Sequence, residues 1–386
     1  MATEAAPLPR ERRRWLESLS TQLLTLLAAF AFAGAVGSII IIAYGESPLK
    51  VYDTVWRFGT SRPQDFARVL VNATPLIFSG LAVAVAFKAG MFNIGVEGQY
   101  IVGMMTASVA AVTLDSLPAF LLLPAVILAA ILGSMVWAAI PAVLKVKTGA
   151  HEVVTTIMLN GAAISLVAYV LLNHIRTAEQ GLIDLRTDVF SEKALIPELA
   201  PSLGLGDQIP GSIHLTWLFP MALVTCLLVW FFLYRTRLGY EVRAVGSSAG
   251  SAEAGGVAIG AAQIKVFLIS GALAGMVGLQ HLLGVRGYLG HNYETQLGFT
   301  GIGVAFLGRN HPAGIPLAAI LIGMLARGEE GIQILTEVPR EIIIILQGVL
   351  ILSVVVAYQI SRRILARRHQ RAEAADRAAA TAEGEA

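Results

Sequence analysis

The chain has 386 residues, of which 56% are hydrophobic and only 14% are charged, and its mean hydropathy is +0.70. A soluble domain carries about 25% charged residues, whereas the apolar runs here reach about 18 residues, the length that spans a bilayer. An ordinary soluble protein is therefore excluded. A net charge of +2 provides no global basic field for nucleic acid, and the single Cys226 excludes an intrachain disulfide and a multi-cysteine metal site.

Segment 1–20 carries the basic stretch "RERRRW" and precedes a long apolar run that continues through "SIIIIAY". The hydrophobic region of a secretory signal is only about 7–15 residues long. We therefore expect a retained first span after a cytoplasmic N-terminal segment.

Apolar runs separated by Gly, Pro and charged residues predict an all-α polytopic membrane protein with about ten transmembrane segments in a permease domain at 21–360, some of them broken or re-entrant. The segments are 21–43, 69–87, 95–114, 118–144, 152–172, 214–234, 263–284, 299–308, 314–327 and 338–360. The two at 299–308 and 314–327 are short, and the breakers Gly308 and Pro312 lie between or beside them. This region is either two spans or one re-entrant hairpin.

Two connecting segments and the C-terminal tail are polar. Residues 173–213 contain Pro, Gly and mixed charge, and predict a structured external loop or small cap. Residues 235–262 contain "SAGSAEAGG", which provides a Ser cap, a short Ala/Glu helix and a Gly stop. This loop predicts a short helix parallel to the membrane on the cytoplasmic side. The tail 361–386 is basic and then rich in Ala and Glu.

Orientation follows from the distribution of Lys and Arg. With ten crossings and the N-terminus inside, one side receives 18 of the 28 basic residues and the other receives ten. Because cytoplasmic loops are enriched in Lys and Arg, we expect both termini in the cytoplasm.

The stretch "KAGMFNIGVEGQYIVGMM" places polar residues and glycines between two apolar runs. A charge at the bilayer centre costs at least about 2.5 kcal/mol, so Glu97 is either an interfacial cap of a helix N-terminus or faces a cavity. If the span begins near Gly95, Glu97 lies within one turn of the inner surface. We expect helix breaks at Gly90, Gly95 and Gly98.

Four residues are candidates for the translocation path: Asn93, Glu97, Gln99 and Asn160. Irregular backbone at membrane depth is tolerated where it lines a cavity, and transporters build their sites on broken helices. For Asn160, which lies mid-span, an interhelical hydrogen bond is the alternative to pore lining. Gly271 and Gly275 form a G-x-x-x-G pattern, which predicts a close helix-packing face.

Catalytic motifs are missing from the sequence. It contains no G-x-x-x-x-G-K-[ST], H-E-x-x-H or C-x-x-C. We therefore expect no catalytic residue, no metal site and no ATPase activity in this chain. An ion-coupled secondary transporter stays open, although it needs deep carboxylates and Glu97 is the only plausible one. An intramembrane enzyme also stays open, although paired catalytic groups are absent.

Four blocks of sequence resemble one known family. "LAVAVAFKAGMFNIGVEGQYIVGMM" resembles permease subunits of ATP-binding cassette importers for branched-chain amino acids, simple sugars and nucleosides. The further blocks "LKVKTGAHEVVTTIMLN", "GYEVRAVGSSAGSAEAGGVAI" and "LGFTGIGVAFLGRNHPAGIPLAAILIGML" are similar to its nucleoside or simple-sugar branch. The resemblance runs from about residue 70 to residue 358.

This resemblance implies a permease in a bacterial-type plasma (inner) membrane that forms half of a pore. Its partners would be a second permease subunit, in a homodimer or heterodimer, two cytoplasmic ATPase subunits that use ATP, and an external substrate-binding lipoprotein. The chain itself would need no cofactor. The solute would be small and polar, a nucleoside or simple sugar. The loop 235–262 would couple to the ATPase through Arg243, Ala244, Gly246, Glu253, Ala254 and Gly256.

Overall fold

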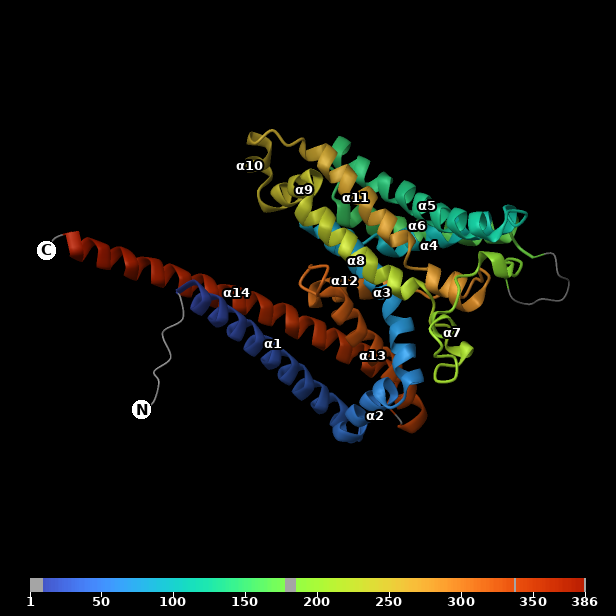
Figure 1. The fold of residues 1–386 in the computed structure, drawn as a ribbon, viewed down its shortest axis with the longest axis horizontal. Coiled ribbons are helices and arrows are strands. Elements are labelled where there is room, and N and C mark those ends of the chain that lie inside the picture. The colour runs from blue at the N-terminus through green and yellow to red at the C-terminus, as the bar shows by residue number, and fades with distance from the viewer. Residues whose placement is uncertain (1–9, 178–184, 337, 385–386) are drawn as a thin grey trace. The chain divides into compact units, whose positions relative to one another are not determined.

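The computed structural model describes residues 10–177, 185–336 and 338–384, and its described secondary structure is helical apart from two isolated bridges (Figure 1). Parts of three predicted segments lie outside the described residues. These parts are 1–9 of the N-terminal segment, 178–184 of the external loop and 385–386 of the tail.

The chain divides into two compact units. The first comprises residues 1–51 and 336–386, in which α1 (Arg10–Ala43) and α14 (Arg340–Gly384) pack against each other. The second comprises residues 52–335 and holds the residues discussed below. Helix α2 (Pro48–Thr60) contains the boundary between the units.

The second unit is a bundle of long helices joined by short ones. Its longer helices are α3 (Pro63–Lys88), α4 (Val96–Thr113), α5 (Ala119–Thr148), α6 (Glu152–Asn173), α8 (Leu218–Arg235), α11 (Ile259–Gly275) and α13 (Ile315–Leu335), and α12 (Leu297–Leu307) is about half as long as most of them. Its short elements are η1 (Glu192–Ala194), α7 (Leu199–Ser202), η2 (Gly211–Ile213), α9 (Arg237–Ser247), α10 (Ala249–Ala254) and the π-helical η3 (Gln280–Arg286).

Each predicted apolar segment coincides with a helix, but the count of about ten spans is not confirmed. By length and composition, six of the described helices qualify as spans, or up to seven if the bent pair Leu27–Ala43 and Pro48–Thr60 counts as one. Helix α12 falls short because it has only 11 residues. The region 299–327 is therefore a short helix followed by a longer one, with Gly308 and Pro312 in the connection between them.

The predicted glycine face of α11 is confirmed as a packing contact with α5. A Cβ atom on Gly275 would lie 2.7 Å from the carbonyl oxygen of Ala130, and one on Gly271 would lie 3.0 Å from that of Ser134. Only the absence of a side chain lets the two backbones approach so closely.

The loop 235–262 contains the predicted short helix, α10, preceded by α9, whereas its cytoplasmic location stays a prediction. Thr236 caps α9 by accepting a hydrogen bond from the N–H of Gly239, and Ser248 caps α10 by accepting one from Ser251. Gly256 follows α10 with φ +81°, a conformation that glycine adopts at little cost. The Ser and Gly signals in the sequence therefore mark the true ends of α10.

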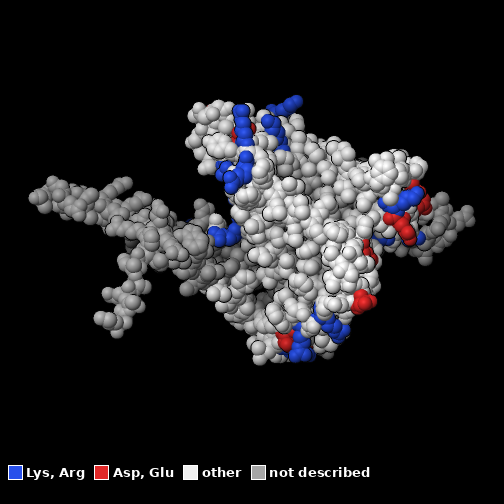
Figure 2. Space-filling view, in the orientation of Figure 1, with Lys and Arg blue, Asp and Glu red and all other residues white. Residues whose placement is uncertain are grey.

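On the face shown in Figure 2, charged side chains gather at the ends of the second unit, and the surface between them carries few. At one end, here called the α9 end, Lys145 and Lys147 lie in the last turn of α5 and Arg235 in that of α8. Helix α3 runs from the opposite end, at Pro63, to the α9 end, at Lys88. An uncharged belt between two charged ends is the surface expected of a bilayer-embedded bundle.

Candidate translocation site and coupling segment

Residues 89–95 form a non-helical segment between α3 and α4. Gly90 turns the chain with φ +71°. Asn93 then fixes the segment: its Oδ1 accepts a hydrogen bond from the N–H of Gly95 at 3.0 Å, and its Nδ2 donates to Ser270 Oγ at 2.9 Å. The Ser270 hydroxyl in turn donates to the carbonyl oxygen of Ala82 at 2.7 Å. This chain of bonds ties the segment to α11 and α3.

Helix α4 begins deep inside the bundle. The carbonyl oxygen of Gln99, in its first turn, accepts a hydrogen bond from Ser134 Oγ at 2.7 Å. Ser134 is followed by 14 further residues of α5 before its end at Thr148, which is roughly 21 Å of helix at 1.5 Å per residue. The prediction that Glu97 lies within one turn of the inner surface is therefore wrong, because the 89–95 segment runs inward before α4 starts.

Glu97 caps the first turn of another helix, α12. Its Oε1 accepts a hydrogen bond from the N–H of Gln296 at 2.6 Å, and its Oε2 accepts one from Gly298 at 2.8 Å. Gln296 has φ 75°, so the chain enters α12 through a left-handed residue. A carboxylate at a helix N-terminus is favoured by the unpaired N–H groups and the helix dipole. Glu97 is therefore a helix cap, which was one of the two alternatives, but it is buried and caps α12 instead of its own helix, α4.

Gly98 and Asn160 meet where α4 crosses α6. Asn160 Oδ1 accepts a hydrogen bond from the N–H of Gly98 at 2.8 Å, and its Nδ2 donates to the carbonyl oxygen of Ile94 at 3.1 Å. Gly98 lies inside α4 and does not break it, contrary to the prediction. Its physical role is close approach, because a Cβ there would lie 2.9 Å from the Cα of Asn160.

The four predicted path residues come together at this depth, and all are buried. Asn93 is 0% exposed, Gln99 1%, Glu97 4% and Asn160 6%. Asn93 and Gln99 are hydrogen-bonded to each other, with Asn93 Nδ2 donating to Gln99 Oε1 at 2.9 Å. Each polar side chain therefore has its partners within this chain.

Sequence reasoning missed Ser134 and Ser270, which join this cluster from α5 and α11. Each is fully buried and bonds across helices, as described above. The only signal was a lone serine inside an apolar run, as in "ILGSMVW" and "FLISGALAG". Such a serine more often bonds to its own helix, as Ser108 does to the carbonyl oxygen of Met104.

The predicted coupling residues lie on α9, α10 and the turn that follows. Arg243 donates from Nε to the carbonyl oxygen of Leu233 at 2.9 Å and lies over the Tyr234 ring. Gly246 packs directly on the carbonyl of Lys88, so α9 is held against the end of α3. Ala244 is half-buried. The others, Glu253, Ala254 and Gly256, are exposed.

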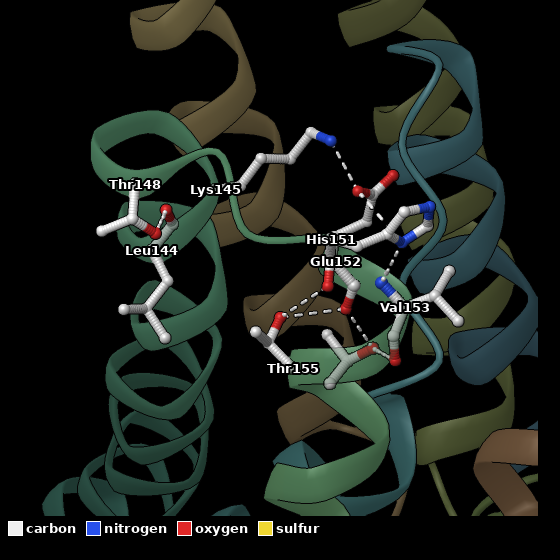
Figure 3. Close-up of polar contacts among 8 residues, drawn as sticks. Leu144, Lys145, Thr148, His151, Glu152, Val153 and Thr155 are labelled. Atoms are coloured by element: carbon white, nitrogen blue, oxygen red, sulfur yellow. Dashed lines mark hydrogen bonds and ion pairs between the residues drawn. The ribbon is translucent and has the colours of Figure 1, made fainter.

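The connection between α5 and α6 follows Lys145 and Lys147 at the α9 end, and Figure 3 shows its polar contacts. Gly149 ends α5 with φ 72°, and His151 caps α6 by accepting a hydrogen bond from the N–H of Val153 at its Nδ1 atom. Lys145 Nζ lies 2.5 Å from Glu152 Oε2, which joins the two helices by an ion pair. This part of the "KVKTGAHEVV" block therefore has a structural role, because it holds the end of α5 against the start of α6.

Comparison with known proteins places the chain in a family. Residues 66–355 match the family described as branched-chain amino acid transport system / permease component. The chain is 34% identical to the glucose ABC transporter permease protein TsgB13 of Haloferax volcanii, over 88% of each chain. It is also 34% identical to the guanosine ABC transporter permease protein NupP of Bacillus subtilis, over 88% of this chain and 95% of that one.

A third relative is the guanosine ABC transporter permease protein NupQ of the same bacterium. It is 26% identical, over 66% of this chain and 78% of that one. These matches confirm the resemblance found in the four sequence blocks. The chain therefore belongs to the family of permease components of branched-chain amino acid transport systems.

Proposed function

We propose that this permease forms half of the translocation pore of an ATP-binding cassette importer for a neutral polar solute, a nucleoside or a simple sugar. The observation that carries this proposal is the near full-length similarity to a guanosine permease and a glucose permease. Both solutes are neutral and rich in hydroxyl groups.

The partner in the pore is a second permease subunit of the same family. In Bacillus subtilis two different guanosine permease proteins, NupP and NupQ, are both similar to this chain. We infer a heterodimer of related chains, with a homodimer as the alternative.

Two cytoplasmic ATPase subunits supply the energy, because this sequence has no P-loop of its own. We place them against α10 and the following turn, where Glu253 and Ala254 are exposed at the α9 end. A short helix of small residues fits a groove on a partner, and Glu253 offers it one charged contact.

The opposite end carries a cleft of about 550 Å³ that suits an external lipoprotein. Its basic lining residues are Arg57, Arg62, Arg68 and Arg327. Asp65 lies within the cleft and pairs with Arg327 at 3.5 Å. Arg327 also pairs with Glu330, and Arg57 pairs with Asp53 at 2.8 Å, so the basic excess lies on Arg62 and Arg68 and favours an acidic docking surface on the lipoprotein. With this end outside, the α9 end is cytoplasmic in an inner membrane, and the distribution of Lys and Arg in the sequence supports two cytoplasmic termini.

The buried cluster around Asn93 has a positional role in this proposal. Asn93, Gln99 and Asn160 hold the start of α4, and Glu97 holds the start of α12, at the depth where a solute would pass. An ion-coupled mechanism is less well supported, because two backbone N–H groups already occupy both oxygens of Glu97.

Uptake by the assembled transporter tests the proposal. We expect ATP-dependent uptake of radiolabelled guanosine or glucose when the chain is produced together with its ATPase, lipoprotein and second permease subunit. An intact complex that accumulates neither solute contradicts the solute class. Reporter fusions after Ala366 and near Leu195 test the orientation, and an external signal at Ala366 contradicts it.

A further inference from the structure

A polar strip, residues 291–296, leads into α12. Every residue in it is exposed or half-exposed, and it contains Asn292, Glu294 and Gln296. The helix that follows is apolar from Leu297 onward. The chain therefore changes from polar to apolar at the first turn of α12.

His281 faces this strip from η3. Its Nδ1 lies 2.6 Å from Glu294 Oε2, and the two side chains remain 31% and 42% exposed. η3 continues the line of α11 as a π-helical turn, and such turns are frequent at functional sites. The two residues are called the 281–294 pair below.

Glu294 lies near mid-depth in the bundle, and His281 lies nearer the predicted external loop, because the preceding Gln280 donates to the carbonyl oxygen of His214 at 2.8 Å and accepts from Thr216 Oγ1 at 2.7 Å. The carbonyl oxygen of Glu294 is 2.9 Å from the hydroxyl of Tyr100, in the second turn of α4. Thirteen further residues of α4 follow Tyr100 before its end at Thr113, about 20 Å of helix. In the other direction, α4 starts roughly 21 Å from the end of α5, as shown above.

An exposed ionisable pair at this depth cannot face lipid. The cost of a charged group in hydrocarbon means that such residues face a bundle interior or a water-filled path. In this single chain the pair is partly exposed, so the path or the second permease subunit must cover it. Residues 291–296 are exposed or half-exposed without interruption and could be hydrated along their whole length. This favours the translocation path over the second permease subunit as the feature that the pair faces.

The inner continuation of this surface is aromatic. Phe299 of α12 is 42% exposed. Further along the helix Phe306 lies 5.5 Å from the ring of Phe87 and 6.1 Å from that of Phe92. Phe87 and Phe92 are 6.4 Å apart. A polar outer half thus passes into an apolar inner half along one helix.

We propose that the 281–294 pair is the solute-contact site of the translocation path, where it binds neighbouring hydroxyl groups of a sugar ring. This inference rests on the proposed function, since it assumes that the path lies on this face. The Glu294 carboxylate can accept hydrogen bonds from two adjacent hydroxyls, and the other nitrogen of His281 can donate or accept one. A ribonucleoside and a simple sugar share this chemistry.

Glu294→Gln and His281→Asn test the site in the complete transporter, with Glu192→Gln, an exposed residue of η1, as the matched control. We expect the two site variants to lose about tenfold or more in uptake efficiency, because a hydrogen bond to a charged group contributes about this much. Comparing the uptake of guanosine, 2′-deoxyguanosine and glucose shows whether the bound sugar ring belongs to a nucleoside or to a simple sugar. If guanosine is the solute, wild type should prefer it to the deoxy form and Glu294→Gln should lose that preference.

Cysteine labelling decides the location without depending on the solute. In a Cys226→Ala background, Glu294→Cys should react with a water-soluble, membrane-impermeant thiol reagent. Val136→Cys, on an exposed apolar face of α5, should not react.

The outcomes separate the two proposals. If wild type transports guanosine or glucose while Glu294→Gln behaves like Glu192→Gln, the solute site is overturned and the proposed function stands. An unreactive Glu294→Cys overturns the location. If wild type carries neither solute, the proposed solute class and the sugar-hydroxyl assignment fall together, and labelling still decides whether the pair faces the path.

Discussion

Glu97 and Gly298 are joined by a 2.8 Å hydrogen bond across 201 positions of sequence. The same carboxylate accepts a second bond from the N–H of Gln296, so one side chain of α4 holds the entry to α12. A Cβ on Gly298 would overlap the backbone of Glu97, so glycine is needed for this approach. The start of α12 is therefore fixed by α4, next to the polar strip.

Replacing Glu97 should destabilise the fold. Glu97→Ala removes the acceptor of the buried N–H of Gly298, at a cost of about 1–3 kcal/mol, and also that of the part-buried N–H of Gln296. Glu97→Gln keeps an acceptor oxygen and should lose less. Thermal unfolding of the purified permease measures the difference, and equal melting of Glu97→Ala and wild type would contradict the capping role.

Asn93 and Ser270 should be energetically coupled. Each of Asn93→Ala and Ser270→Ala removes the same bond, so the double variant should be more stable than the sum of the single changes implies. A coupling energy of about 0.5–3 kcal/mol is usual for residues in contact. Strict additivity in a double-mutant cycle would show that the bond contributes nothing.

Two glycines of the coupling region should respond in opposite ways to alanine. Gly246→Ala places a methyl group on the Lys88 carbonyl and should cost about 1–3 kcal/mol by overpacking. Gly250→Ala, in α10, meets open space and should be neutral or slightly stabilising. Melting temperature and retention of the ATPase are the measurements, and equal effects would refute the α9–α3 contact.

Ala254→Trp tests the ATPase contact more cleanly than a change at Gly256. Ala254 is exposed, so the permease should fold normally and lose its ATPase on purification, together with transport. Gly256 has φ +81°, so any side chain there strains the turn by itself. Normal ATPase binding and uptake by Ala254→Trp would show that coupling lies elsewhere.

His311, between α12 and α13, should make stability depend on pH. Burial, and then the charges of Lys88 and Arg309, hold the pKa of His311 below its usual value of 6.5. Its neutral Nδ1 accepts a hydrogen bond from the N–H of Ala313 at 3.2 Å. A lowered pKa in the folded state means that the unfolded state binds more protons, so its contribution to stability is full above 6.5 and falls as the pH drops below it.

His311→Asn supplies the control, because an Asn oxygen can still accept from Ala313 but does not titrate. The melting temperature of wild type should fall more than that of His311→Asn between pH 7 and pH 5. Parallel pH profiles would exclude His311 as the source.

Local signals in the sequence predicted local structure well. The Ser and Gly positions around 248–256 marked the ends of α10, and the glycine spacing of α11 marked its packing face. The sequence could not reveal the depth of α4, because that depends on how far the 89–95 segment runs inward. It also could not pair Glu97 with α12, since no local pattern encodes a bond between helices about 200 residues apart. Gly98 was misjudged because a glycine needed for contact looks like one that breaks a helix.

Helix α3 has a consequence for how the partners influence one another. Its first residues line the arginine cleft, and the carbonyl of its last residue, Lys88, rests on Gly246. One continuous helix therefore connects the arginine cleft with α9, the helix that precedes the proposed ATPase contact on α10. Suppose that α3 has two positions and that each partner binds one of them more tightly. Binding of the ATPase then changes the affinity of the permease for the lipoprotein by some factor. Binding of the lipoprotein must change the affinity of the permease for the ATPase by the same factor. Measuring either affinity in the presence and absence of the other partner would then report on both.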